Sequence, residues 1–291
     1  MNFDEFIDTA WNDHADRPQD VADRLAASLR IIETADQIPP FARLATHVFG
    51  EHLGQWRRGI FVLDALRDLP AFDNRAIVTS VLARSVAVLR YASGDHDALA
   101  PLAHEDRVSV LATASSAFAG RHEYKHALAA YTEALRLAQP GLPSGSPAIR
   151  ALAVGGNNLA AALEAKRNRD AIETSGMIAA AERGLAFWKQ AGTWLEEERA
   201  EYRLARSLLE AGEYAAALQS ARRCIAVCAA NDAPTFEQFF GYAALALAQR
   251  AAGDAIGFEG SRKDARRMFD LVAPNEKPWC KAEIDELGDC N

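Results

Sequence analysis

Apolar and small side chains recur at three- and four-residue steps along most of the chain, the spacing of one buried face of an α-helix. The clearest stretch covers residues 196–230. In its first half the spacing is followed by Tyr202, Ala205, Leu208 and Leu209. In its second half it is followed by Ala217, Leu218, Ala221, Cys224, Ile225 and Cys228. The pattern predicts two amphipathic helices joined by a turn at 211–214.

Similar turns recur and divide the chain into units. They lie at residues 53–56, 93–96, 119–124, 167–170, 211–214 and 252–254. Successive turns are about 26 to 48 residues apart, close to the range of helical-hairpin repeats. Each contains Gly except the fourth, where Asn168 stands in its place, and Gly is expected to end the first helix with a positive φ. The spacing predicts roughly six helical hairpins between residues 38 and 273.

Within 196–230, small residues stand where two antiparallel helices must touch: Ala205, Ala217, Ala221 and Cys224. This alternation of small and large side chains resembles the tetratricopeptide (TPR) repeat, and further copies surround Gly120 and the segment 157–160. The resemblance implies an all-α fold, a right-handed α-solenoid of antiparallel helix pairs. It also implies that the first helix of each pair lines a concave groove that binds a protein or peptide.

Two segments interrupt the repeat. Residues 139–147 are rich in Pro, Gly and Ser, so we expect a loop between repeats at 38–138 and at 148–273. Residues 1–37 are expected to form N-terminal capping helices, the second beginning at Asp16 or Pro18. Residues 274–291 are expected to form a C-terminal cap with a helix at 282–287, because the end units of a solenoid otherwise expose an apolar face.

The resemblance also points to ligand-binding residues. Counting back from each turn gives the groove-facing positions, which in the fourth and fifth units are Asn158, Arg199 and Arg203, with Asn157 beside them. This set resembles part of the clamp with which some TPR proteins hold a peptide carboxylate. An Asn side chain can bond to an extended backbone, and Arg can grip a carboxylate with two parallel hydrogen bonds.

One observation weighs against a complete clamp, and one alternative explains the arginines without it. The preceding unit has Ala112 and Ser116 where the family has Lys and Asn. The alternative is that both arginines pair with Glu196, Glu197 or Glu201 on a solvated face of their own helix.

Composition and charge narrow the function. Hydrophobic residues make up 49% and charged residues 25%, which is ordinary for a soluble globular protein. A net charge of −8 argues against general nucleic-acid binding, which needs a basic face. Residues 1–5 are acidic where a secretory signal is basic, and the uncharged runs at 108–120 and 238–249 are too short to span a bilayer. We predict a cytoplasmic protein that binds neither nucleic acid nor membranes.

One segment matches a catalytic motif. Residues 122–126 read His-Glu-Tyr-Lys-His, the HExxH pattern of zinc peptidases, in which two histidines share one helix face and the Glu activates a water. Here the match falls on a turn of the repeat, and Tyr124 and Ala127 are explained by packing. We favour the structural interpretation, although Glu164 could supply a third ligand.

The other candidate ligands are cysteines and scattered histidines. Cys224 and Cys228 are one helical turn apart and could form a four-sulfur zinc site with Cys280 and Cys290, but buried packing is the simpler interpretation. Among the histidines, His47 and His52 are five residues apart and are expected not to share a helix face. The histidines that stand alone are His14, His96 and His104.

We therefore predict a non-enzymatic scaffold with no cofactor and no metal ligands. Its ligand-binding residues would be Asn157, Asn158, Arg199 and Arg203, and its partner a protein or peptide offering an acidic segment or a C-terminus. A regulatory peptide receptor of similar fold is one alternative. A zinc-dependent hydrolase using residues 122–126 is the other.

Overall fold

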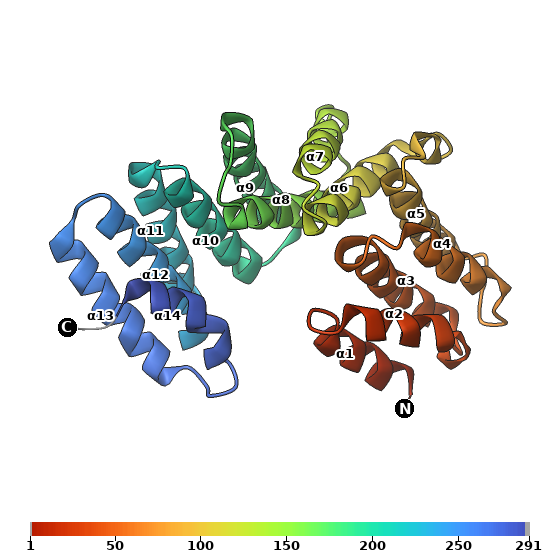
Figure 1. Cartoon of the computed structure of the whole chain (residues 1–291), viewed down its shortest axis with the longest axis horizontal. Helices are drawn as coiled ribbons and strands as arrows, with labels where there is room; N and C mark the ends of the chain where they lie inside the picture. The colour runs from red at the N-terminus through yellow and green to blue at the C-terminus, as the bar shows by residue number, and fades with distance from the viewer. Residues whose placement is uncertain (1, 289–291) are drawn as a thin grey trace. The chain divides into compact units, whose positions relative to one another are not determined.

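The computed structural model describes residues 2–288 of the chain (Figure 1). Within that range every regular element is a helix, and the connections are turns and short loops. This confirms the predicted all-α fold. The chain divides into two compact units, Met1–Gly155 and Gly156–Asn291, with the boundary inside α8 (Pro147–Ala165). The finer division into caps and half-stacks stays a prediction.

Unit 1 holds the first helical pairs and the N-terminal helices. Its elements are α1 (Phe3–Asp13), α2 (Pro18–Ala27), η1 (Leu29–Ile31), η2 (Ala35–Gln37), α3 (Ile38–Thr46), the π-helix η3 (His47–His52), α4 (Trp56–Ala65), η4 (Leu66–Asp68), α5 (Ala76–Ala92), η5 (His96–Leu99), α6 (His104–Gly120), α7 (Tyr124–Ala138) and the first part of α8.

Unit 2 holds the later pairs. Its elements are the rest of α8, α9 (Ala171–Ala191), α10 (Trp194–Glu210), α11 (Tyr214–Ala230), α12 (Thr235–Ala251), α13 (Ala255–Leu271), η6 (Lys277–Cys280) and α14 (Lys281–Leu287).

Large side chains fill the N-terminal part of unit 1. Phe6 of α1, Phe41 of α3 and Phe49 of η3 are completely or almost completely buried in one cluster. A capping box fixes the start of α1, since the Asn2 side chain accepts from the backbone N–H of Glu5 at 2.9 Å and the Glu5 carboxylate accepts in return at 3.0 Å. The second helix begins at Pro18, one of the two predicted starts.

Small residues separate the helices of unit 2, as the sequence predicts. Ala205 of α10, Ala221 of α11 and Ala244 of α12 form one buried cluster, and Cys224 is completely buried. Because these side chains are short, the helix backbones can approach closely. In Figure 1 α10 and α11, and then α12 and α13, follow one another as antiparallel pairs.

The C-terminal helix closes a second apolar cluster. Cys280 and Leu287 are buried together with Phe239 of α12 and Met268 of α13. Helix α14 therefore packs on α12 (Figure 1), and its Lys281 start agrees with the predicted helix at 282–287 within one residue.

The turns confirm one glycine prediction and correct another. Gly212 has φ +82°, the left-handed conformation expected at the end of α10. Gly120 is instead the last residue of α6, and His122, with φ +61°, takes the left-handed place in that turn. The predicted register was thus wrong by two residues. Gly120 is required for space, because a Cβ there would lie 2.7 Å from the backbone oxygen of Glu51.

Candidate binding surface on α10

Helix α10 begins with a reciprocal cap and carries charged side chains on its open side. Thr193 caps the helix, and the Glu196 carboxylate accepts from the Thr193 backbone N–H at 2.8 Å. Four side chains follow at helical spacing, and together we call them the α10 surface: Arg199, Tyr202, Arg203 and Arg206. Arg199 is exposed and the other three are half-buried.

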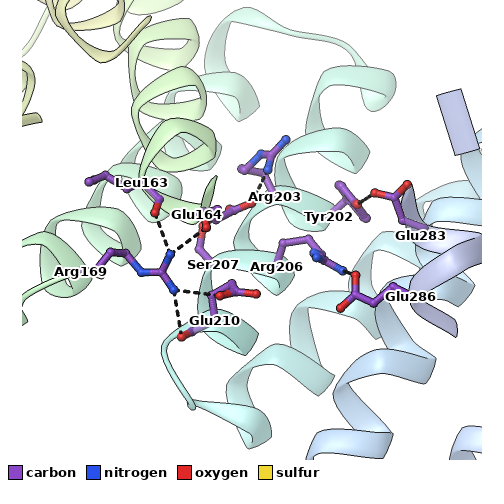
Figure 2. A network of polar contacts seen from close by, with 10 residues as sticks. All are labelled: Leu163, Glu164, Arg169, Tyr202, Arg203, Arg206, Ser207, Glu210, Glu283 and Glu286. Atoms are coloured by element: carbon purple, nitrogen blue, oxygen red, sulfur yellow. Dashed lines mark hydrogen bonds and ion pairs between the residues drawn. The ribbon is translucent and has the colours of Figure 1, made fainter. Parts of the chain in front are cut away.

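Arg203 is tied to α8 through Glu164 (Figure 2). The Arg203 guanidinium donates to one oxygen of Glu164, and the Ser207 hydroxyl donates to the other at 2.5 Å. Burial raises the pKa of Glu164, and the positive charge of Arg203 opposes that rise. Within residues 2–288 the buried Nε of Arg203 has no hydrogen-bond partner. The ion pair therefore connects α8 to α10, and the Nε–H group of Arg203 remains as an unused donor.

Arg169 fixes the end of α8 that presents Glu164. Its Nη1 donates to the backbone oxygens of Leu163, Glu164 and Lys166 at 2.8, 2.8 and 2.6 Å. Its Nη2 donates to the Glu210 carboxylate at 2.8 Å (Figure 2). The guanidinium thus donates to carbonyls of the last turn of the helix, one of which, that of Leu163, also accepts from the Lys166 backbone N–H at 3.1 Å. Asn168, expected in the place of Gly, does not adopt a positive φ.

Arg199 is tied to α12 through Glu237. Its Nε donates to Glu237 at 3.2 Å, and its Nη2 donates to the other carboxylate oxygen. Next to this pair, burial raises the pKa of Glu198 to about 8, opposed by a hydrogen bond from Cys224 and assisted by the charge of Glu237. The raised pKa favours the protonated form of Glu198 near neutral pH.

The four predicted ligand residues lie on two neighbouring helices. Asn157 and Asn158 are half-buried on α8. They precede Glu164 by about two helical turns, so roughly 9–10 Å of helix separates them from the Arg203 pair. The structure connects Arg203 to α8 through Glu164 and connects Arg199 to α12. A joint ligand site of all four residues stays a prediction.

The alternative prediction, that Arg199 and Arg203 form ion pairs with glutamates, was right about the ion pairs but wrong about which glutamates take part. The carboxylates that hold them come from α8 and α12, not from α10 itself. Glu197 and Glu201 of α10 instead lie 3.3 and 3.5 Å from the Lys189 ammonium of α9.

Helix α14 occupies the other part of the α10 surface. The Tyr202 hydroxyl donates to Glu283 at 2.5 Å, and Arg206 Nη1 donates to Glu286 at 2.8 Å (Figure 2). Burial, and then the charge of Glu283, raises the pKa of Tyr202, so its proton is retained. The sequence pattern predicts only packing for Tyr202 and only a cap for α14. The signal that could have revealed their contact is the run of carboxylates at 283–286 opposite an arginine-bearing helix.

Comparison with known proteins gives a fold. No family model matches the chain, and no curated protein matches its sequence. A crystal structure of "putative kinesin light chain nearly identical TPR-like repeats" from Podosopora anserina matches with a TM-score of 0.51 and 15% identity, over 81% of this chain and 96% of that chain. A single-substitution variant of the same protein matches with a TM-score of 0.51 and 14% identity, over 80% and 93%. The chain has a TPR-like helical-repeat fold.

In this fold α10 packs on α11 and α12 packs on α13, so α10 and α12 are the first helices of these two pairs. Because the sequence identity to these structures is only about 15%, the matches show the fold and nothing about the function. Within residues 2–288 no helix has the length and apolar character needed to cross a membrane.

The HExxH segment does not have the peptidase geometry. His122 lies in the turn before α7, and its Nδ1 lies 2.9 Å from the Tyr124 hydroxyl. His126 is exposed, and its Nδ1 lies 3.0 Å from the Glu123 carboxylate. Because His122 is outside the helix, the two histidines do not lie one turn apart on one helix face.

The cysteines are packing residues in the described part of the chain. Cys224 and Cys228 are buried in α11, and a hydrogen bond between them, together with burial, raises the pKa of the Cys224 thiol. Cys280 is buried between α12 and α14. Cys290 lies outside the described residues, so the four-sulfur alternative is not tested there.

The prediction that His14 stands alone and that His47 and His52 point apart was wrong. The rings of His47 and His52 are 4.7 Å apart between centroids, and His14 lies 5.0 Å from both. The reason is local: the chain forms the π-helix η3 where an α-helix was expected.

Proposed function

We propose that this chain is a non-enzymatic binding module that holds an acidic segment of a protein partner on the α10 surface. One observation carries the proposal: α14 already rests there through two carboxylates, Glu283 on Tyr202 and Glu286 on Arg206. A helix of the chain itself thus supplies an example of the ligand. The fold supports a role in protein interaction, since stacked helical repeats offer extended binding surfaces.

The ligand would extend beyond the place that α14 covers. Arg199 is exposed and Arg203 lies one helical turn further along, so acidic side chains could reach both while Glu237 and Glu164 hold the guanidinium groups in place. Asn157 and Asn158 on α8 would then contact the backbone of the same ligand. A cytoplasmic location and the choice between a scaffold and a regulatory receptor stay predictions.

The proposal makes α14 an internal competitor. A partner segment that uses Tyr202 and Arg206 must displace Glu283 and Glu286 first. Weakening the α14 contacts should therefore raise the affinity for an acidic ligand, and the gain equals the free energy that α14 contributes in its bound position.

A peptide titration tests this. The probe is a fluorescein-labelled synthetic peptide of residues 276–288, measured by anisotropy. The full chain carrying Glu283→Lys and Glu286→Lys should bind it at least about tenfold more tightly than the unchanged chain, because lysines oppose Arg206 and release α14. Adding Arg206→Glu should remove the gain, and binding should weaken with salt.

The matched control reverses two carboxylates whose partners in residues 2–288 lie on their own helices, α13 and α14. Glu259 pairs with Arg262 and Asp285 pairs with Lys281, so Glu259→Lys with Asp285→Lys gives the same net charge. This control should bind the peptide as the unchanged chain does. Equal binding by the released variant and the control, with helicity preserved in both, would contradict the proposed role of the α10 surface.

A further inference from the structure

Three histidines of unit 1 converge at the end of α1. His14 follows α1, while His47 and His52 are the first and last residues of η3. One ring nitrogen from each lies within 4.8 Å of the others, and the Nε2 atoms of His47 and His52 are 3.1 Å apart. All three residues are half-buried.

The π-helix creates this convergence. Five residues along an α-helix end about 140° from the starting direction, so His47 and His52 would point apart. In η3 the Leu53 N–H instead bonds to the Val48 oxygen at 3.1 Å, an i to i+5 bond, which brings residues five apart onto one face. Val48, Phe49 and Gly50 are buried, so packing holds this irregular segment in place.

Outer hydrogen bonds orient the rings. Nδ1 of His47 lies 2.9 Å from the Glu51 carboxylate, and Nδ1 of His14 contacts the backbone oxygen of Trp11. These contacts occupy the Nδ1 atoms of both rings, and the Nε2 of His47 faces the Nε2 of His52. A metal-ligating histidine has the same arrangement, with the second ring nitrogen donating to a carboxylate or carbonyl.

We propose that His14, His47 and His52 form a three-imidazole site for a divalent transition-metal ion of the zinc class. Zinc–imidazole bonds of about 2.0–2.1 Å at tetrahedral angles place ligand nitrogens roughly 3.3 Å apart, close to the His47–His52 separation. Nitrogen ligands favour zinc, cobalt, nickel or copper over magnesium and calcium. The fourth coordination position is left to water or an external ligand. The proposal departs from the prediction that the chain has no metal ligands.

The surroundings supply charge of both signs. Glu51 offers a carboxylate next to His47, while Arg121 donates to the backbone oxygen of His52 at 2.8 Å. Trp11 packs on His14 and His47, with ring centroids 5.1 and 5.3 Å away, and covers one side of the cluster. In the present contact one of the two facing Nε2 atoms donates a proton to the other. A bound ion needs both as acceptors, so the proton moves to the other nitrogen of the His52 ring or to solvent.

Cobalt titration tests the site. The full chain, without an affinity tag and stripped of metal by a chelator, is titrated with Co²⁺ and then with Zn²⁺. We expect one equivalent of Co²⁺ with the visible absorption of a four-coordinate nitrogen and oxygen site, without a thiolate charge-transfer band, and displacement by Zn²⁺. Glu51→Gln should weaken binding about 10- to 100-fold by removing the outer hydrogen bond.

The ligand variants and their control decide the outcome. His47→Gln and His52→Gln should abolish the Co²⁺ spectrum, and so should His14→Gln, which lies outside η3 and leaves the π-helix unchanged. The control replaces His122 and His126 with Gln and should bind as before. Circular dichroism of the metal-free variants checks folding. No Co²⁺ uptake at millimolar concentration, uptake that survives in folded His14→Gln, or loss in the control would overturn the proposal.

Discussion

Unit 2 keeps the helical-hairpin repeat, whereas unit 1 departs from it at three places. In unit 2, α10 to α13 are helices of 17 residues each, and Gly212 and Gly253 occupy the left-handed position of their turns. In unit 1 the π-helix η3 ends one first helix, the single turn η5 stands where a second helix was expected, and His122 replaces the turn glycine.

Whether the repeat is regular or broken determines how charged and histidine side chains come together in each unit. In unit 2 the regular spacing brings carboxylates of α8, α12 and α14 against successive positions of α10. In unit 1 the three histidines meet because the repeat is broken at η3. In unit 2, regular repeats bring together charged side chains from several helices. In unit 1, the irregular segment η3 places two histidines on one face, beside His14 at the end of α1.

The largest expected effect tests the packing that holds the irregular segment. Phe49→Ala should lower the free energy of unfolding by about 3–5 kcal/mol, because the side chain is completely buried in η3 and its removal leaves a cavity. Chemical denaturation measures the change. Phe61→Ala, at a 76% exposed position of the same unit, should stay within about 0.5 kcal/mol. A loss below about 1 kcal/mol at Phe49 would show that other contacts hold the π-helix.

The next effect tests the regular unit. Glu164→Ala should cost about 2–3 kcal/mol, because Arg203 and Ser207 both lose their acceptor. Glu164→Gln should cost less, since the amide oxygen still accepts and burial already disfavours the charged form. Thermal and urea denaturation provide the measurement, with the exposed Glu182→Ala as control. Equal stability of both Glu164 variants and the control would mean that α8 and α10 are held by apolar contacts alone.

A third effect depends on pH. The pKa of Glu198 is about 8 in the folded chain against an ordinary 4.5, so the folded state binds the proton more tightly. Protonated Glu198 therefore contributes to the free energy of unfolding fully below about pH 4.5, and this contribution is lost as the pH rises towards 8. The loss is at most about 1.4 kcal/mol per pH unit. Glu198→Gln, which resembles the protonated acid, should therefore be increasingly more stable than the unchanged chain from pH 5 to pH 8. A pH-independent difference would contradict the raised pKa.

The contrast also explains what the sequence could predict. The spacing of apolar residues predicted the helices, and Gly212 was placed correctly because its turn follows the common pattern. The α10 partners were missed because Glu164 and Glu237 lie about 40 residues from their arginines, a distance at which spacing alone says nothing of contact. His14, His47 and His52 were missed because an i to i+5 bond depends on the packing of Phe49 and Gly50, which local pattern does not encode.

The smallest effect concerns the two turns. Gly212 has φ +82° and no atom within 4 Å of the place that a Cβ would take, so Gly212→Val should cost roughly 1 kcal/mol or more through backbone conformation alone. His122 has φ +61° at the equivalent place, so His122→Gly should relieve a similar strain. The gain is reduced by the greater freedom of Gly in the unfolded chain and by loss of the contact with Tyr124. We expect a net stabilisation of a few tenths of a kcal/mol, measured by thermal denaturation.

Gly120→Ala distinguishes the predicted turn, with Gly120 in the left-handed conformation, from the observed turn, with His122 in that conformation. If Gly120 held the left-handed turn, Ala would be strained there and His122→Gly would bring no benefit. In the structure Gly120 is helical, and the added Cβ would meet the backbone oxygen of Glu51 at 2.7 Å. The cost should therefore arise from contact between α6 and η3, and it should disturb Glu51, the partner of His47. Gly120→Ala should thus lower both the thermal stability and the Co²⁺ affinity, whereas Gly212→Val should lower stability and leave Co²⁺ binding unchanged. Loss of Co²⁺ binding in both variants would mean that the effect is general destabilisation and not a displacement of Glu51.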